Sequence, residues 1–270
     1  MDNMYARRDL NRASASADAH SAKLFSRFDV IMLDAMNTIF IAKGGKYHMY
    51  HEFLRTLDIE TSDASLARAF TRERTHFESL AETERRKGHK VEVAEVWARI
   101  NAGVILEFAK GKINGSAEEI GRQMHHDYLR SPSWFEVHKD MRQFLEIAHG
   151  RTLIAVASNH QKGSLPRFIS YFKLRELVDM VFTSEKLGFE KPDPRFFNGV
   201  TRELSAVVPN LETRRMLMVG NNIINDVSGA RQAGITHAVL LDWNNEFRGE
   251  KEVQRVSSPL ELLRLEFPSR

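Results

Sequence analysis

At 270 residues, the chain is long enough to bury most of its apolar surface, either as one large domain or as a core with an inserted second domain. With 42% hydrophobic and 28% charged residues, it is neither disordered nor fibrous, and no apolar run approaches the roughly 18 residues of a membrane span. The 39 basic and 36 acidic residues are spread through the chain and leave a net charge of only +3, so we expect neither a nucleic-acid nor a membrane partner.

The first predicted strand ends at a candidate nucleophile. Residues 1–23 are rich in Ala, Ser, Asp and Arg and contain no apolar core, so we expect a flexible N-terminal tail without a secretory signal. The apolar run over residues 28–33 then predicts a buried strand that ends at Asp34, just before a tight turn. A carboxylate held in this way can attack phosphorus or carbon. The turn carries three further residues that could belong to a functional site, which are Met36, Asn37 and Thr38.

The segment from residue 44 to residue 131 is predicted to be all helical. It contains few prolines, and its apolar residues recur at spacings of three and four, as in Phe53, Leu57, Leu66 and Phe70. Ser131-Pro132 then marks the return to a different pattern. We therefore expect a helical domain inserted between two parts of one core, residues 24–43 and 132–270.

Helices and strands alternate after residue 132, which predicts a parallel sheet with helices on both faces. The expected strands cover residues 152–157, 180–183, 215–219 and 238–241, and the expected helices cover residues 137–148, 165–171, 194–204 and 227–233. Ligands bind beyond the carboxyl ends of such strands. Three more polar segments are expected there, which are Ser158-Asn159-His160, Lys191-Pro192, and Gly220-Asn221 followed by Asp226.

Together these segments resemble the four ordered motifs of the haloacid dehalogenase (HAD) superfamily. The motifs are a strand-end Asp with Thr four residues later, a strand-end Ser or Thr, a Lys before Pro, and Gly-Asp followed by Asn-Asp at a helix start. The matching residues are Asp34, Thr38, Ser158, Lys191 and Asp226. The resemblance covers about residues 27–242. It implies a Rossmann-like α/β core with an inserted helical cap, and a hydrolase that works through an aspartyl covalent intermediate.

The resemblance also implies a role for each matching residue. Asp34 would be the nucleophile, while Thr38, Ser158 and the backbone N–H groups of residues 35–37 would donate hydrogen bonds to the transferring group. Lys191 would neutralise Asp34 and the incoming anion. Asp226 would cap its helix, pair with Lys191 or reach a divalent cation.

Four further residues adjoin these motifs and are expected to contact the substrate. They are Met36, Asn37, Asn159 and His160. The position of His160, directly after Ser158-Asn159, suggests that its imidazole could act in place of a missing general acid.

Two departures from the family pattern limit what the resemblance implies. Met36 stands where the family's phosphatases have a second Asp that protonates the leaving oxygen and later activates water, and a thioether can do neither. General acid–base catalysis of this kind is typically worth about 10²–10⁴-fold in rate. Asn221 stands where the family supplies an acidic metal ligand. A Mg²⁺ site would then consist of Asp34, Asp226 and Asn221, and we expect it to bind the ion weakly because hard cations prefer charged oxygen.

Three functions are compatible with this sequence. The first is a phosphohydrolase or phosphotransferase acting through Asp34 on a small, anionic phosphorylated metabolite. The second is a metal-independent, dehalogenase-like enzyme acting at carbon, to which Met36 would present an apolar contact. The third is a catalytically silent binding protein. Because the chain has no cysteine, disulfides and thiolate metal sites are excluded, and we expect a cytoplasmic protein.

Overall fold

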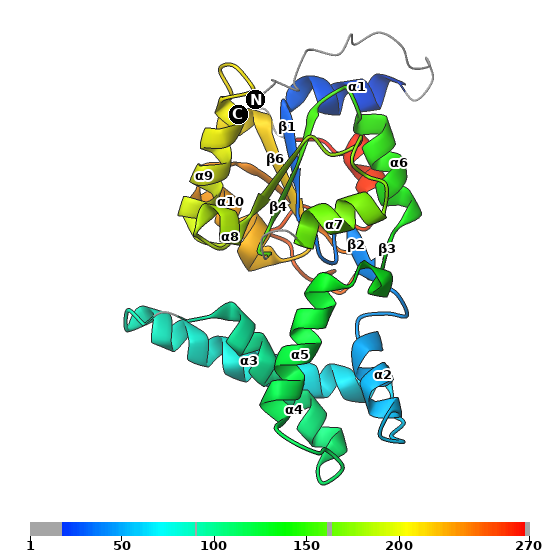
Figure 1. The fold of residues 1–270 in the computed structure, drawn as a ribbon. Helices are drawn as coiled ribbons and strands as arrows, with labels where there is room; N and C mark the ends of the chain where they lie inside the picture. Colours follow the sequence, from blue (N-terminus) through cyan, green and yellow to red (C-terminus); the bar gives the residue numbers. More distant parts are fainter. Residues whose placement is uncertain (1–17, 90, 161–163, 268–270) are drawn as a thin grey trace. The chain divides into compact units, whose positions relative to one another are not determined.

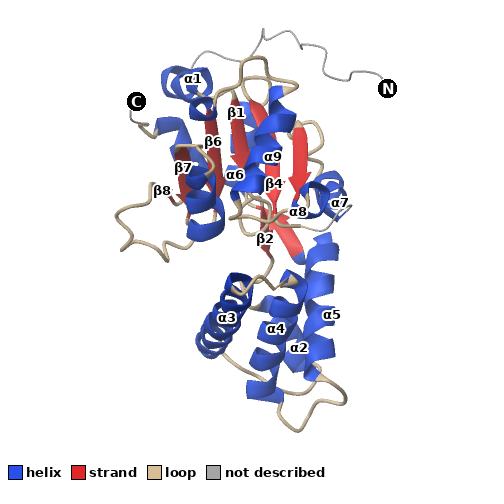
Figure 2. Ribbon diagram, turned by 90° about the vertical axis from the view of Figure 1, so that its left-hand side faces the viewer, coloured by secondary structure: helices blue, strands red, loops and turns tan. Residues whose placement is uncertain are grey.

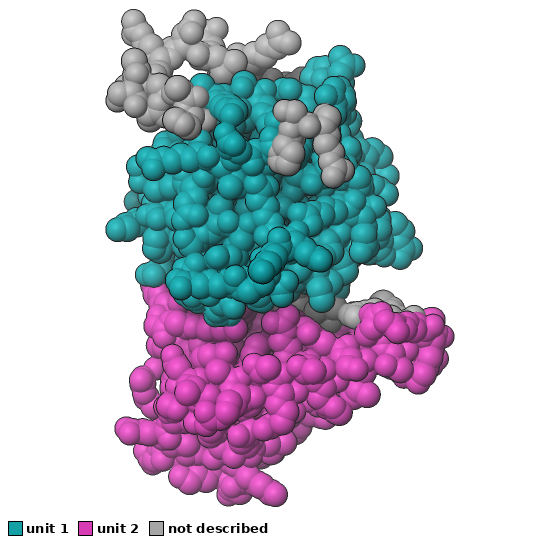
Figure 3. All heavy atoms as spheres, turned by 180° about the vertical axis from the view of Figure 1, so that it is seen from behind, with its two compact units in different colours: residues 1–41, 136–270 teal, residues 42–135 magenta. Residues whose placement is uncertain are grey.

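The computed structural model describes residues 18–89, 91–160 and 164–267. The chain divides into two compact units, residues 1–41 with 136–270 and residues 42–135, which Figure 3 colours separately. Most of the expected flexible tail, residues 1–17, lies outside the described residues. The last residues of that tail, 18–23, are helical instead, because they belong to α1 (Asp18–Arg27). This helix is anchored by its buried residues Leu24 and Phe25. Within the described ranges, no helix has the length and apolar character that crossing a bilayer requires.

The first unit is built around a six-stranded parallel sheet in the order β5-β4-β1-β6-β7-β8. Its central strand, β1 (Val30–Leu33), lies between β4 (Leu153–Ser158) and β6 (Met216–Gly220). Every residue of β1 is buried, because helices cover both faces of a parallel sheet, and this explains its unbroken apolar sequence. The outer strands are β5 (Met180–Thr183), β7 (His237–Leu241) and β8 (Arg255–Val256).

Helices pack on both faces of this sheet (Figures 1 and 2). On one face lie α8 (Ser184–Leu187), α9 (Pro194–Ser205) and α10 (Gly229–Gln232), and on the other lie α6 (Lys139–Ala148) and α7 (Ser164–Tyr171). Successive residues of a strand point to opposite faces. Val30 and Met32 of β1 accordingly belong to one buried cluster with Phe196 and Phe197 of α9.

The second unit is helical. Its helices are α2 (His48–Arg55), α3 (Asp63–Arg86), α4 (Val93–Ala109) and α5 (Ala117–Arg130). At its centre, the Tyr50 hydroxyl donates to Asn101 Oδ1 at 2.6 Å, and Asn101 Nδ2 donates to the Gly121 carbonyl at 3.0 Å. A Cβ atom at Gly121 would lie 2.2 Å from the Ala98 carbonyl oxygen, so glycine lets α5 approach α4 closely. Where the chain leaves and re-enters the first unit, β2 (Phe40–Ala42) pairs with β3 (Phe135–Val137).

The predicted fold class is confirmed, since a parallel α/β core carries an inserted all-helical segment. The expected strands agree with β4, β5, β6 and β7 to within one residue at each end. The helix expected over residues 227–233 differs. Its first part belongs to a π-helical turn, Ile223–Ser228, and α10 follows that turn.

Candidate active site

The candidate site lies where three neighbouring strands end at the same edge of the sheet. Asp34 follows β1, Ser158 ends β4 and Gly220 ends β6. The register pairs Leu33 with Val156 on one side and with Val219 on the other. The next residue of each strand is therefore level with Asp34, which brings segments far apart in the sequence together at one point.

The turn after Asp34 is held by its own backbone. The N–H groups of Ile39 and Phe40 both donate to the Ala35 carbonyl at 2.9 Å. Asn37 has a φ of 59°, a left-handed conformation that Asn tolerates better than most residues, and its N–H donates to the Phe40 carbonyl at 2.7 Å. That N–H is thus used inside the turn, which corrects the expectation that it donates to a ligand.

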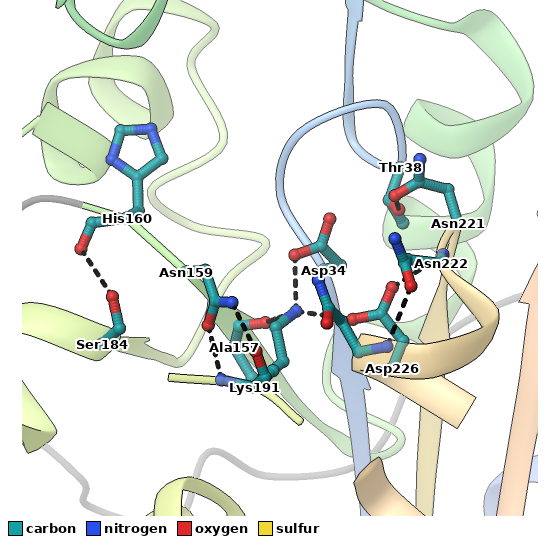
Figure 4. A network of polar contacts seen from close by, with 11 residues as sticks. Asp34, Thr38, Ala157, Asn159, His160, Ser184, Lys191, Asn221, Asn222 and Asp226 are labelled. Carbon is teal, nitrogen blue, oxygen red and sulfur yellow. Dashed lines mark hydrogen bonds and ion pairs between the residues drawn. The ribbon is translucent and has the colours of Figure 1, made fainter. Parts of the chain in front are cut away.

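Lys191 occupies the centre of the site (Figure 4). Its Nζ lies 2.7 Å from Asp34 Oδ1, 2.6 Å from Asp226 Oδ1 and 2.8 Å from the Ala157 carbonyl oxygen. The Lys191 and Asp226 side chains are only 2% and 1% exposed, whereas Asp34 retains 11%. The ammonium therefore donates three hydrogen bonds within a buried network, and of the two carboxylates Asp34 is the one with access to a ligand.

This burial has opposite electrostatic effects on the two partners. Burial raises the pKa of Asp226 to about 6, and the nearby Asp34 charge adds to the rise, while Lys191 counteracts it. Burial by itself would lower the pKa of the Lys191 ammonium, but the charges of Asp226 and Asp34 outweigh burial and raise it. Lys191 is therefore a cation throughout the neutral pH range. The pKa of Asp226, about 6, lies just below that range.

Asp226 is held by a tight loop at the end of β6. Its Oδ2 accepts a hydrogen bond from the Asn222 N–H at 2.9 Å, so each carboxylate oxygen has a protein donor. A Cβ atom at Gly220 would lie 2.2 Å from that same Oδ2, so only glycine fits there. The Asn222 side chain caps the π-helical turn by accepting from the N–H groups of Ile224 and Asn225 at 3.0 and 2.9 Å. The sequence analysis missed Asn222, although an Asn at the start of a helix is a recognisable N-cap signal.

Asn221 and Met36 occupy the two positions that depart from the family pattern. Asn221 is half-buried, and its Oδ1 lies 3.5 Å from the hydroxyl of the fully buried Thr38. Met36 is also half-buried and lies in the turn after Asp34. Because these residues are a methionine and an asparagine, neither position supplies a carboxylate to the site.

These residues fit a divalent cation poorly. The described residues contain no cluster of three or more Asp, Glu, His or Cys side chains that could hold a metal ion. The only two carboxylates of the site already share the Lys191 ammonium, and both oxygens of Asp226 are engaged. A cation would have to rely on the neutral Asn221 amide as its third side-chain ligand.

The two residues after Ser158 do not point where a substrate-binding role would place them. Asn159 uses both ends of its amide on the Lys191 backbone, accepting from the Lys191 N–H at 2.7 Å and donating to its carbonyl at 2.8 Å. The His160 ring points away from Asp34 (Figure 4), and its Nδ1 lies 2.6 Å from the Ser164 hydroxyl. A general-acid role for His160 therefore has no support in this geometry.

The chain thus combines an α/β fold with a strand-end carboxylate, Asp34, that is paired to a buried lysine, Lys191. A family model for haloacid dehalogenase-like hydrolases matches residues 28–234. The chain belongs to this family.

Individual relatives agree with the family. The chain is 33% identical to haloacid dehalogenase-like hydrolase domain-containing protein 3 of Bos taurus over 123 residues. This aligned segment covers 45% of this chain and 46% of that protein. It is 35% identical over 69 residues to a glyceraldehyde 3-phosphate phosphatase of Methanothermobacter thermautotrophicus, 26% of this chain and 28% of that protein. The chain thus matches less than half the length of either relative.

The fold also matches a solved structure. The HAD hydrolase YfnB of Bacillus subtilis, described bound to magnesium, superposes with a TM-score of 0.68 over 87% of this chain and 97% of that one. At 15% identity, this likeness establishes the fold alone.

Proposed function

We propose that this protein hydrolyses a small phosphorylated metabolite through a covalent intermediate on Asp34. The observation that carries the proposal is the bridge from Lys191 to Asp34. Lys191 donates a hydrogen bond to Oδ1 of Asp34. Among the described residues, none donates a hydrogen bond to Oδ2 of Asp34. A carboxylate fixed through one oxygen presents the other for attack. The partial similarity to a glyceraldehyde 3-phosphate phosphatase supports phosphate as the substrate class.

The reaction takes two displacements. In the first, Asp34 Oδ2 forms a bond to phosphorus while the bond from phosphorus to the leaving oxygen breaks, and the leaving group takes that electron pair. In the second, water attacks the same phosphorus and the bond from phosphorus to Asp34 Oδ2 breaks, so that inorganic phosphate leaves and the Asp34 carboxylate is regenerated. The proton that the water loses passes to bulk solvent, because the Met36 thioether cannot accept it. Lys191 offsets the negative charge, and the Ser158 hydroxyl donates to a phosphoryl oxygen. The Thr38 hydroxyl would do the same by giving up its 3.5 Å hydrogen bond to Asn221 Oδ1.

Met36 selects the leaving group. A thioether cannot donate a proton to the departing oxygen, and the geometry gives His160 no access to that role. Substrates whose leaving group departs without protonation are therefore favoured. Acyl phosphates meet this condition, whereas alkyl phosphates do not.

Weak dependence on Mg²⁺ is part of this proposal. Members of the family that use this ion gain from it charge compensation at the transferring phosphoryl group. Here the ammonium of Lys191 supplies positive charge between the two carboxylates, and Asn221 adds no negative ligand. We expect Mg²⁺ to stimulate turnover only modestly.

A second candidate function is displacement at carbon, as in the dehalogenases of the family. Met36 is the observation that favours it, because an apolar side chain next to the nucleophile suits a carbon centre better than a phosphoryl group. The same Asp34 oxygen would attack carbon and expel a halide with its electron pair. Release of halide from a 2-haloacid, without metal, would distinguish this function from the first.

The test is turnover of acetyl phosphate by the purified protein, with Mg²⁺ and with a chelator. Asp34→Asn should abolish turnover, and acid quenching of the unmodified protein with labelled substrate should trap phosphate on the peptide that contains Asp34. Asp58→Asn is the matched control, since Asp58 is exposed and belongs to the helical unit. Turnover of the unmodified protein no faster than that of Asp34→Asn would reject the proposal.

A further inference from the structure

The Lys191 side chain and the Lys191 backbone are both held by the end of strand β4. Its Nζ donates to the carbonyl of Ala157, and its peptide is held by the side chain of Asn159. Ala157, in β4, thus holds the side chain of the lysine, and Asn159, just after β4, holds its backbone. Ala157 contributes only a backbone carbonyl, so the side chain that makes this arrangement specific is Asn159.

The oxygen and the nitrogen of the Asn159 amide both hydrogen-bond the backbone of Lys191. Its Oδ1 accepts from the Lys191 N–H at 2.7 Å, and its Nδ2 donates to the Lys191 carbonyl at 2.8 Å. Both distances are short for N–H···O hydrogen bonds, and the two bonds fix the orientation of the amide as well as its position. An amide engaged in this way is not turned toward a ligand.

We propose that Asn159 is the positioning residue for Lys191, which sets the ammonium against Asp34 and the bound anion. The proposal rests on the proposed function in assigning Lys191 to the substrate anion. Without Asn159, the segment around Lys191 loses the two hydrogen bonds that tie it to β4. The ammonium then retains its ion pairs with Asp34 and Asp226, but its backbone anchor can shift.

The effect should reach anion binding through the lysine. Charge interactions and hydrogen bonds weaken steeply with distance and misalignment, so a small shift of Nζ matters. We expect Asn159→Ala to weaken binding of inorganic phosphate about tenfold, which corresponds to about 1.4 kcal/mol. Asn244→Ala, in an exposed loop of the same unit, is the matched control and should leave binding unchanged.

The experiment is a double-mutant cycle read by calorimetric titration with inorganic phosphate. Asn159→Ala is compared in the unmodified protein and in Lys191→Met. If Asn159 acts through the lysine, its substitution has less than about a twofold effect once the ammonium is gone. An equal loss in both backgrounds would show that Asn159 contacts the anion directly and would overturn the proposal. A lower unfolding midpoint with unchanged phosphate affinity would indicate a merely structural role and would overturn it too.

The role of Asn159 can be decided even if the protein does not turn over substrate or if Lys191→Met does not fold. Phosphate binding requires no turnover, so an inactive protein would reject the proposed function while the cycle still decides the role of Asn159. If Lys191→Met does not fold, a crystal structure of Asn159→Ala with phosphate gives the same distinction. A displaced Nζ supports positioning, and an unmoved Nζ with weaker phosphate binding refutes it.

Discussion

Replacing Met36 by Asp tests whether a missing general acid limits the proposed reaction. The substitution places a carboxyl group two residues after Asp34, in a turn whose backbone hydrogen bonds link residues 35, 37, 39 and 40. Since none of these bonds involves the side chain at position 36, Asp34 should keep its place. Met36 is half-buried, so the new carboxyl group can reach solvent and a leaving group.

The expected gain depends on the leaving group. A positioned general acid contributes about 10²–10⁴-fold, or roughly 3–5 kcal/mol of barrier height, when the leaving oxygen must be protonated. For an alkyl phosphate we expect Met36→Asp to raise kcat/KM by that factor. For acetyl phosphate the gain should stay below about threefold, because acetate departs without needing the proton.

The assay compares kcat/KM for both substrates in the unmodified protein, Met36→Asp and Met36→Asn. The asparagine variant has nearly the size and polarity of the aspartate variant but no proton to transfer. A gain shared by both variants, or equal for both substrates, would refute the reasoning. No gain with either substrate would show that something other than acid catalysis limits turnover.

The remaining predictions concern the charges around Lys191. Lys191→Met leaves two buried carboxylates without their cation and should lower the free energy of unfolding by about 3–5 kcal/mol in urea titrations at pH 7; a loss below about 1 kcal/mol would contradict the ion-pair geometry. Because burial raises the pKa of Asp226 to about 6, Asp226 takes up its proton at higher pH than an ordinary carboxyl group, so turnover should fall as pH drops through about 6; a decline that begins only near pH 4 would refute this. Asn221→Asp should raise Mg²⁺ affinity about tenfold or more in calorimetric titrations, because a carboxylate is a stronger ligand for a hard cation than an amide, and unchanged affinity would place the metal elsewhere.

Sequence reasoning succeeded where one physical signal dominated. The strands β1, β4 and β6 are recognisable because a parallel strand buried on both faces is almost continuously apolar. Since parallel strands end at the same edge, the residues that follow them had to meet, and Asp34 and Asp226 do meet at Lys191. The two-residue strand β8 and helix α1 carry weaker patterns and were not predicted.

Side-chain direction was the part that sequence could not supply. Asn159 has a donor and an acceptor, and nothing in the sequence says whether they face a ligand or the neighbouring backbone. His160 has a similar ambiguity, which the structure resolves toward Ser164. The carbonyl of Ala157, which accepts from Lys191, has no signature at all because every residue has a carbonyl.

The two departures from the family pattern act on the same quantity, the charge of the site. Two carboxylates and one ammonium leave a net charge of −1 when Asp226 is ionised. Aspartates at positions 36 and 221 would make it −3, and an anionic substrate could then enter only with a strongly bound cation to offset the repulsion. Met36 and Asn221 each remove one negative charge, so the requirement for metal falls as general acid catalysis is lost. A site changed in this way remains suited to an anion with a good leaving group, which is the substrate class that we propose for Asp34.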